Sequence, residues 1–344
     1  MAESAKKTYP AVDIWKFCCA ILVIAIHAKP FVNNFWLDAG VGIATRIAVP
    51  YFFISSGYFL FSKLDRTPKE RKNSVYGHYF LRILKMYTVW YVIHTVLRTA
   101  YGSLEPRSLL SYIRNYFIPM DGSILWFLNA LLWGTLIVYL LNRVLNRKVI
   151  FVISAVTLVI GYSFTTVYSP LEGVAAFAKV RNLVYSRIGV QNGLFFAFPY
   201  LALGALMSQS APLKPRPRTD CIGAVLCVCL LAAESLAAVL VFHAPLTFLW
   251  LSALPMTYFV FRFTLTTDLG ANVPTHMIRR MSTGMYVIHR LILDGLEALV
   301  AVAGLSDPQN LLLFGSTVVL TVLISYALVK LSAVKGFGFL KIMI

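Results

Sequence analysis

Ten apolar stretches, separated by short polar segments, form the most regular pattern along the chain. Each is close to the roughly 20 residues that an α-helix needs to cross the hydrocarbon core of a bilayer. Their approximate bounds are 13–31, 40–62, 79–101, 123–142, 149–168, 191–208, 221–242, 244–263, 281–304 and 310–332. The pattern predicts an all-α fold, a polytopic membrane bundle of about ten transmembrane helices. No polar segment is long enough to divide the chain, so we expect a single domain over residues 1–344.

The composition agrees with a membrane protein. Hydrophobic residues make up 59% of the chain and charged residues only 13%, and the mean hydropathy is +0.74. A soluble domain cannot bury that share of apolar side chains in its core.

Charges gather in particular connecting segments. The chain has 31 Lys and Arg against 14 Asp and Glu, a formal net charge of +17. The cations concentrate before the first stretch, after the last and in every second connection: Lys6, Lys7, Lys63, Arg66, Lys69, Arg71, Lys72, Arg143, Arg147, Lys148, Lys214, Arg216, Arg218, Arg279, Arg280, Lys335 and Lys341. The positive-inside rule then predicts that both termini are cytoplasmic. The partner of the excess charge is expected to be anionic lipid headgroups, not nucleic acid.

Three of the connections carry further structural signals. Residues 102–122 predict an amphipathic helix on the outer surface. Residues 169–190 are expected to be the longest external loop. Residues 209–220, with three prolines and three cations, are typical of an extended cytoplasmic connector.

The first stretch contains three ionisable residues, Asp13, Lys16 and His27. Because an α-helix turns about 100° per residue, His27 lies within about 20° of Lys16 and roughly 16 Å further along the axis. Asp13 lies one turn before Lys16, where the two could pair. Charge in a bilayer is costly and by default marks a function, and a histidine can exchange a proton near neutral pH. This stripe is therefore the first candidate site.

Polar residues in the second and third stretches allow two interpretations each. Ser56 lies beside Gly57 among aromatic residues, which fits close helix packing as well as a substrate contact. Arg82 and Lys85 lie one turn apart at the cytoplasmic mouth of the third stretch. They could hold the phosphates of a cytosolic cofactor, or they could extend to lipid headgroups.

The ninth stretch is the other dense group of polar residues. Tyr286 and His289 are spaced i,i+3, and Arg290 and Asp294 are spaced i,i+4. The second pair could simply neutralise itself, while His289 could orient a substrate or bond a neighbouring helix. No His-x-x-x-His pair, P-loop or Rossmann glycine pattern occurs, so we expect no metal site.

Five segments jointly resemble the acyltransferase-3 family of ten-span bacterial membrane proteins. They are Lys16 with His27 eleven positions later, Phe52-Phe53-Ile54-Ser55-Ser56-Gly57-Tyr58, Arg82-x-x-Lys85, Ser123-Ile124-Leu125-Trp126-Phe127-Leu128, and Ser282-x-x-x-Tyr286-x-x-His289. Lys16 and Lys85 stand where arginine is frequent in that family. Lysine keeps the charge but loses the bidentate guanidinium, which affects the expected strength of cofactor binding more than the reaction class.

Within that family, the segment from Asn192 to Gly204 looks most like the membrane half of the vancomycin-resistance serine racemases. Those proteins carry a soluble racemase domain after the membrane part. Because this sequence ends at Ile344, we do not expect racemase activity from it.

The resemblance implies an O-acyltransferase of the bacterial cytoplasmic membrane. It would move an acyl group, commonly acetyl from acetyl-CoA, to a hydroxyl of an extracytoplasmic glycan or other cell-envelope acceptor, without a metal. His27 would act as general base or carry the acyl group in transit. The candidate residues are His27, Lys16 and Asp13 for catalysis, Arg82, Lys85, Tyr286, His289 and Ser282 for the donor, and Trp126, Ser56 and Arg290 for the acceptor.

Two alternatives stay open at this point. A transporter of serine or another small polar solute would use Lys16, Arg290 and Asp294 as its binding and coupling charges. A membrane scaffold would need these charges only to set helix register. The sequence does not indicate the acceptor, the acyl length or the oligomeric state.

Overall fold

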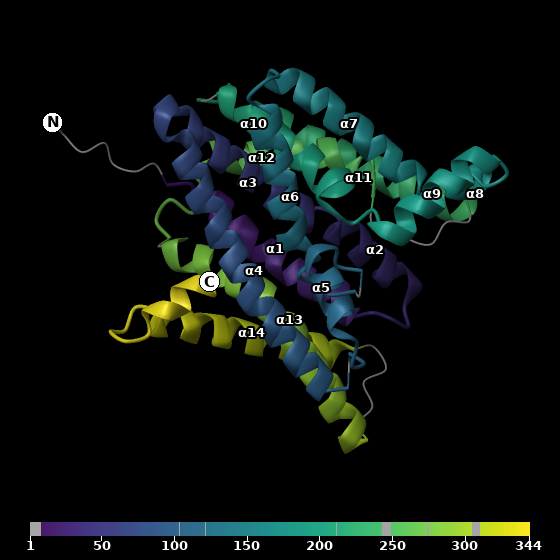
Figure 1. The fold of residues 1–344 in the computed structure, drawn as a ribbon, viewed down its shortest axis with the longest axis vertical. Helices are drawn as coiled ribbons and strands as arrows, with labels where there is room; N and C mark the ends of the chain where they lie inside the picture. Colours follow the sequence, from purple (N-terminus) through teal and green to yellow (C-terminus); the bar gives the residue numbers. More distant parts are fainter. Residues whose placement is uncertain are drawn as a thin grey trace.

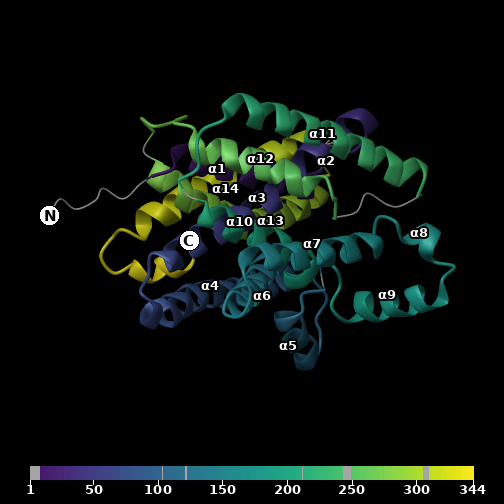
Figure 2. The same ribbon diagram turned by 90° about the horizontal axis from the view of Figure 1, so that it is seen from above.

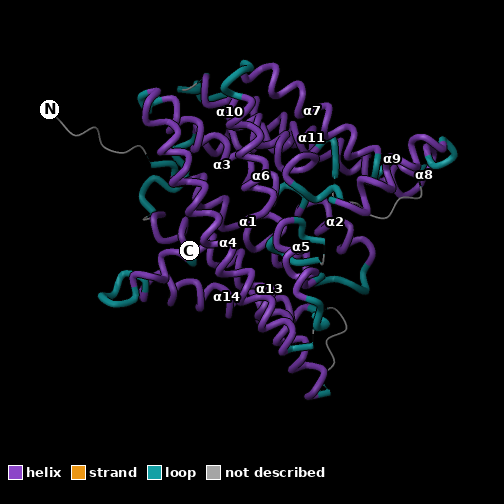
Figure 3. Tube along the Cα trace, viewed as in Figure 1, coloured by secondary structure: helices purple, strands orange, loops and turns teal. Residues whose placement is uncertain are grey.

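The computed structural model describes residues 8–102, 104–120, 122–210, 212–242, 249–273, 275–304 and 310–344. Within these ranges every regular element is a helix, as Figure 3 shows. The all-α class is therefore confirmed. Lys6, Lys7 and the first residues of the predicted 244–263 stretch lie outside the described residues.

The helices follow one another along the chain with short connections. They are α1 (Pro10–Ala28), α2 (Phe35–Thr45), α3 (Ala48–Asp65), η1 (Lys69–Arg71), α4 (Lys72–Ala100), α5 (Leu109–Phe117), α6 (Trp126–Leu141), α7 (Arg147–Ser163), α8 (Tyr168–Leu171), α9 (Ala175–Arg187), η2 (Gly193–Ala197), α10 (Phe198–Gln209), α11 (Pro217–Leu240), α12 (Ala253–Thr266), α13 (Thr275–Ala303), α14 (Leu311–Leu331) and η3 (Gly338–Ile342).

Four helical segments among the described residues are long and apolar enough to cross a membrane. They are Pro10–Ala28, Phe35–Asp65, Pro217–Leu240 and Leu311–Leu331. Helices also overlap each of the other predicted apolar stretches, but they are shorter or carry more charge. The helical membrane character is thus supported, while the number of ten crossings stays a prediction.

The 40–62 stretch lies within Phe35–Asp65, one of the four candidate spans, and has an internal break between α2 and α3 at Arg46 and Ile47. One sequence expectation needs correction. The 169–190 segment, expected as a loop, contains α8 and the 13-residue helix α9. The segment Ala175–Arg187 has no Gly or Pro and is rich in Ala, Lys, Arg and Leu, residues with high helix propensity, which explains the helix. By contrast, α5 lies within the predicted amphipathic helix at 102–122.

The helices pack around a central group. In Figure 2, α1, α3, α10 and α13 lie between α11 and α12 on one side and α4, α6 and α7 on the other. In Figure 1, α8 and α9 project from one edge of the bundle. α13 packs against both α1 and α14, so the functional residues expected on α1 and α13 lie on neighbouring helices.

Ion pairs join the ends of neighbouring helices. They are Arg147–Asp65 (2.6 Å), Arg279–Asp13 (2.7 Å) and Arg262–Asp220. They connect the start of α7 to the end of α3, the starts of α13 and α1, and the end of α12 to the start of α11. In each pair, both helix ends are ones that the charge pattern assigns to the cytoplasmic side. The structure keeps these ends together, while their orientation in a membrane stays a prediction.

The crossing of α3 and α10 depends on two glycines. A Cβ at Gly57 would collide with the backbone oxygen of Leu201, and one at Gly204 with the backbone of Ile54. Close packing, one of the two interpretations of the small residues near Ser56, is therefore present at this crossing.

Candidate functional site

A small pocket lies where the end of α1 meets the α2–α3 junction, the start of α6 and the segment before η2. It is lined by Val23, Ile26, His27, Thr45, Arg46, Val49, Pro50, Ile124, Trp126, Phe127, Gln191, Phe196 and Tyr286. Its cavity volume of about 80 Å³ exceeds the 10–15 Å³ that one water requires. The pocket brings His27, Trp126 and Tyr286 together, three residues that the sequence had singled out separately.

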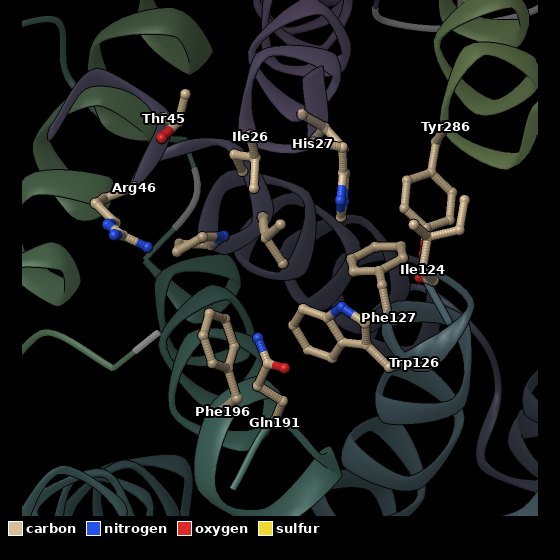
Figure 4. A pocket seen from close by; sticks show the side chains of 13 residues that line it. Ile26, His27, Thr45, Arg46, Ile124, Trp126, Phe127, Gln191, Phe196 and Tyr286 are labelled. Atoms are coloured by element: carbon tan, nitrogen blue, oxygen red, sulfur yellow. The ribbon is translucent and has the colours of Figure 1, made fainter. Parts of the chain in front are cut away.

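His27 is held in the last turn of α1, and Figure 4 shows its ring directed into the pocket. The helix ends directly after it, because Lys29 adopts a left-handed conformation (φ 48°) and Pro30 follows. The histidine therefore lies at the helix end that faces the pocket, roughly 16 Å along the axis from Lys16.

The ring of His289 in α13 lies beside that of His27. The two imidazole rings have centroids 5.3 Å apart. Nδ1 of His289 lies 2.8 Å from the carbonyl oxygen of Tyr286 and 3.2 Å from that of Met285. Because a carbonyl only accepts, Nδ1 must carry the proton, and Nε2 is left as an acceptor. Nε2 is buried and has no hydrogen-bond partner among the described residues.

Tyr286 closes one side of the pocket. Its hydroxyl donates a hydrogen bond to the backbone oxygen of Ile124, at the start of α6. Its ring packs against that of Phe127, with centroids 4.9 Å apart. These contacts connect α13 to the start of α6 beside His27.

Arg46 and Gln191 are pocket residues that the sequence analysis did not identify. Figure 4 shows their side chains, with those of His27 and Trp126, directed toward a common space. Neither residue belongs to a recognisable motif. The break between α2 and α3 brings Arg46 to the pocket. The only feature of the sequence that could have indicated its role was the presence of a cation inside the apolar 40–62 stretch.

The other two residues of the first-stretch stripe lie away from the pocket. Asp13 pairs with Arg279 through both carboxylate oxygens, at 2.8 and 2.7 Å, and also accepts from Thr275. Lys16 lies over the ring of Phe59, 5.4 Å from its centroid. The expected Asp13–Lys16 pair is therefore wrong, because the planar guanidinium of Arg279 binds the carboxylate in a bidentate manner.

The predicted donor residues are dispersed. Arg82 and Lys85 are exposed on α4 and form no ion pair with a described acid. Ser282 is buried and bonds the carbonyl of Ile278 in its own helix. Ser56, which was expected to contact the acyl acceptor and not the donor, is half-buried on α3 and does not line the pocket.

Arg290 belongs to a charge cluster that extends from α13 to a second helix, α4. Asp294 pairs with Arg290 at 2.7 Å, as the i,i+4 spacing suggested, and also with Arg98 of α4 at 3.2 Å. Asp294 is only 2% exposed. Two guanidinium groups thus neutralise one buried carboxylate and connect α13 to α4. The described residues contain no cluster of His, Cys, Asp and Glu that could hold a metal ion.

The helices define an all-α protein with membrane-spanning character, and His27 lines a pocket between them. The model of the Acyl_transf_3 family, an acyltransferase domain, matches residues 9–330. The chain therefore belongs to the acyltransferase 3 family, as the five sequence segments had suggested.

Relatives with a described function match part of the chain. Two amino-acid racemases of Enterococcus faecalis are each 27% identical to it, over 59% and 56% of this chain. A serine/alanine racemase of Enterococcus gallinarum is 23% identical over 60% of it. The matches cover only 29%, 28% and 30% of those proteins, so the chain spans less than a third of their length. No solved structure matches it.

Proposed function

We propose that this protein transfers an acyl group, most simply acetyl from cytosolic acetyl-CoA, to a hydroxyl of a cell-envelope acceptor on the far side of the bacterial cytoplasmic membrane. The observation that carries the proposal is His27, whose ring is directed into a small pocket and lies 5.3 Å, centroid to centroid, from the ring of His289. Membership of an acyltransferase family supports the reaction class.

In the proposed reaction, His27 removes the proton of the acceptor hydroxyl. The oxygen attacks the thioester carbonyl, the new C–O bond forms, and the C–S bond breaks. The imidazolium then returns its proton to the departing CoA thiolate. A route through a transient acyl-histidine would use the same side chain as nucleophile.

His289 would hold His27 in the required tautomer. With its own proton bonded to the Tyr286 carbonyl, its Nε2 can accept a hydrogen bond from one nitrogen of His27. The other nitrogen of His27 then presents a lone pair to the pocket. Figure 4 shows Trp126 and Tyr286 beside that space, where they would confine the acyl group.

Arg82 and Lys85 would bind the phosphates of the donor. Both are exposed, and neither forms an ion pair with a described acid, so their charges are available to an anion. The pairing of Asp13 with Arg279 would secure the same end of the bundle, next to Lys16.

His27→Ala tests the reaction directly. We expect acyl transfer to fall by at least about 10²-fold, the usual contribution of a positioned general base, with unchanged expression and thermal unfolding. The measurement is release of CoA from acetyl-CoA by purified protein in nanodiscs with a cell-envelope extract as acceptor. Val23→Ala, a conservative change in the same pocket, is the matched control. Near-normal transfer by folded His27→Ala protein would contradict the mechanism.

A transporter of serine or a similar small polar solute is the second candidate. It is favoured by the relatives, one of which is a serine/alanine racemase, and by a pocket that combines a cation with a histidine. Uptake of labelled serine into proteoliposomes without acetyl-CoA would support it over acyl transfer.

A further inference from the structure

The pocket around His27 has an uneven balance of charge. Arg46 is the one fully ionised side chain among its lining residues, and none of them is Asp or Glu. No ion pair joins Arg46 to any acid in the described part of the chain. A guanidinium in this position costs desolvation free energy that no protein carboxylate offsets.

The fold presents Arg46 to the pocket in a fixed orientation. Arg46 is the residue at which α2 ends, next to Ile47, so its side chain emerges from a break between two helices. The guanidinium lies over the indole ring of Trp250, 5.5 Å from its centroid. A cation–π contact of this kind uses no N–H hydrogen bond, so the guanidinium N–H groups can still bind an anion.

Other donors face the same space. Figure 4 shows the Gln191 amide and the indole nitrogen of Trp126 directed toward it from the opposite side. Tryptophan donates only, and the amide can donate twice. Together with five guanidinium N–H groups, these donors suit an anionic oxygen group, and a few convergent polar groups in an apolar pocket are the usual form of a ligand site.

We propose that the acceptor carries an anionic group, a carboxylate or a phosphate, and that Arg46 binds this group so that a neighbouring hydroxyl reaches His27. This inference rests on the proposed acyl transfer and adds the chemical class of the acceptor. Because Arg46 and His27 line one small pocket, the anion and the hydroxyl must be close together in the acceptor.

The test compares three small acceptors that share a primary hydroxyl: glycerol, glycerol 3-phosphate and glycerate. Purified full-length protein in nanodiscs receives acetyl-CoA and each compound at equal ionic strength, and CoA release is measured. Thermal stabilisation by each compound without acetyl-CoA is measured in parallel, because ligand binding to the folded state raises stability by mass action. We expect at least one anionic compound to stabilise and accept the acetyl group at least about tenfold better than glycerol, the effect of one charge-assisted contact.

Arg46→Gln should remove that tenfold preference, whereas Arg46→Lys should keep part of it. Arg66→Gln changes an exposed arginine just after α3 and serves as the matched control. A larger effect with glycerate would identify the anionic group as a carboxylate, and a larger effect with glycerol 3-phosphate would identify it as a phosphate.

The outcomes separate the two proposals. Equal stabilisation and transfer for all three compounds, or an unchanged preference in folded Arg46→Gln protein, would overturn the anion site alone. Anion-dependent stabilisation that needs Arg46, with no His27-dependent CoA release, would keep the anion site and reject acyl transfer. If glycerate and glycerol 3-phosphate stabilise the protein no more than glycerol does, and none of the three accepts the acetyl group, the anion site is overturned.

Discussion

His27 and His289 come from opposite ends of the sequence, yet their rings lie 5.3 Å apart. Each has a different environment: His27 reaches the pocket, while His289 is fully buried and bonded to its own helix through Nδ1. In the proposed reaction the two histidines have distinct tasks: His27, which lines the pocket, would transfer the proton, and His289 would orient it.

At this scale we predict that His289→Leu lowers kcat for acyl transfer at least about tenfold with little change in the KM for the acceptor. The reason is that leucine lacks the ring nitrogen of His289 that would accept a hydrogen bond from His27 and so orient it. His289→Gln should restore much of the rate, because its amide oxygen can accept the same hydrogen bond. Steady-state kinetics of the two variants give the measurement. Equal losses in both, or a change confined to KM, would mean that His289 contacts the substrate instead.

Among the elements, α3 and α10 approach each other so closely that glycine is required on both helices at their crossing. Gly57 and Gly204 face each other's helix backbones, and neither site has room for a methyl group. The same two helices are connected at one end through Arg147, which bonds Asp65 of α3 and Ser208 of α10. The pocket residues Val49 and Phe196 lie on or next to these helices, so the crossing also sets the shape of the site.

We therefore predict that Gly204→Ala and Gly57→Ala each destabilise the protein by about 1–3 kcal/mol, the cost of overpacking. Gly315→Ala in α14 is the matched control, because a Cβ there meets nothing within 4 Å, and it should be neutral or slightly stabilising. Thermal unfolding in detergent gives the comparison. If the Gly204→Ala protein were as stable as the control, α3 and α10 could move apart with little loss of folding free energy, and the prediction would be wrong.

In the whole molecule, the ion pairs that join helix ends lie away from the His27 pocket. Ion pairs gather helix ends that the charge pattern assigns to the cytoplasm, and the His27 pocket lies near the opposite end of α1. A donor from one side and an acceptor from the other would then meet inside the bundle, which a soluble enzyme cannot arrange.

This arrangement predicts that acetyl-CoA stabilises the purified protein and that Arg82→Gln combined with Lys85→Gln weakens the shift. Loss of two phosphate contacts should reduce affinity at least about tenfold, and stabilisation follows affinity by mass action. Arg216→Gln with Arg218→Gln removes two exposed cations before and within the first turn of α11 and should have no effect. Stabilisation by L-serine but not by acetyl-CoA would instead favour the transporter.

The sequence by itself determined the helical membrane class and the family, and it singled out three of the residues that line the pocket, His27, Trp126 and Tyr286. Apolar length and charge placement act locally, so they can be read without knowing how helices pack. The spacing of Tyr286 and His289 likewise survives folding, because both lie in one helix.

Only the tertiary structure decided which of these residues meet. It separated Asp13 and Lys16 from the His27 pocket, gave Asp13 to Arg279 and added Arg98 to the Arg290–Asp294 pair. It also brought Arg46 and Gln191 to the same pocket, although neither carries a motif. Contacts between helices depend on rotation and crossing about each axis, and one sequence pattern is compatible with several such packings.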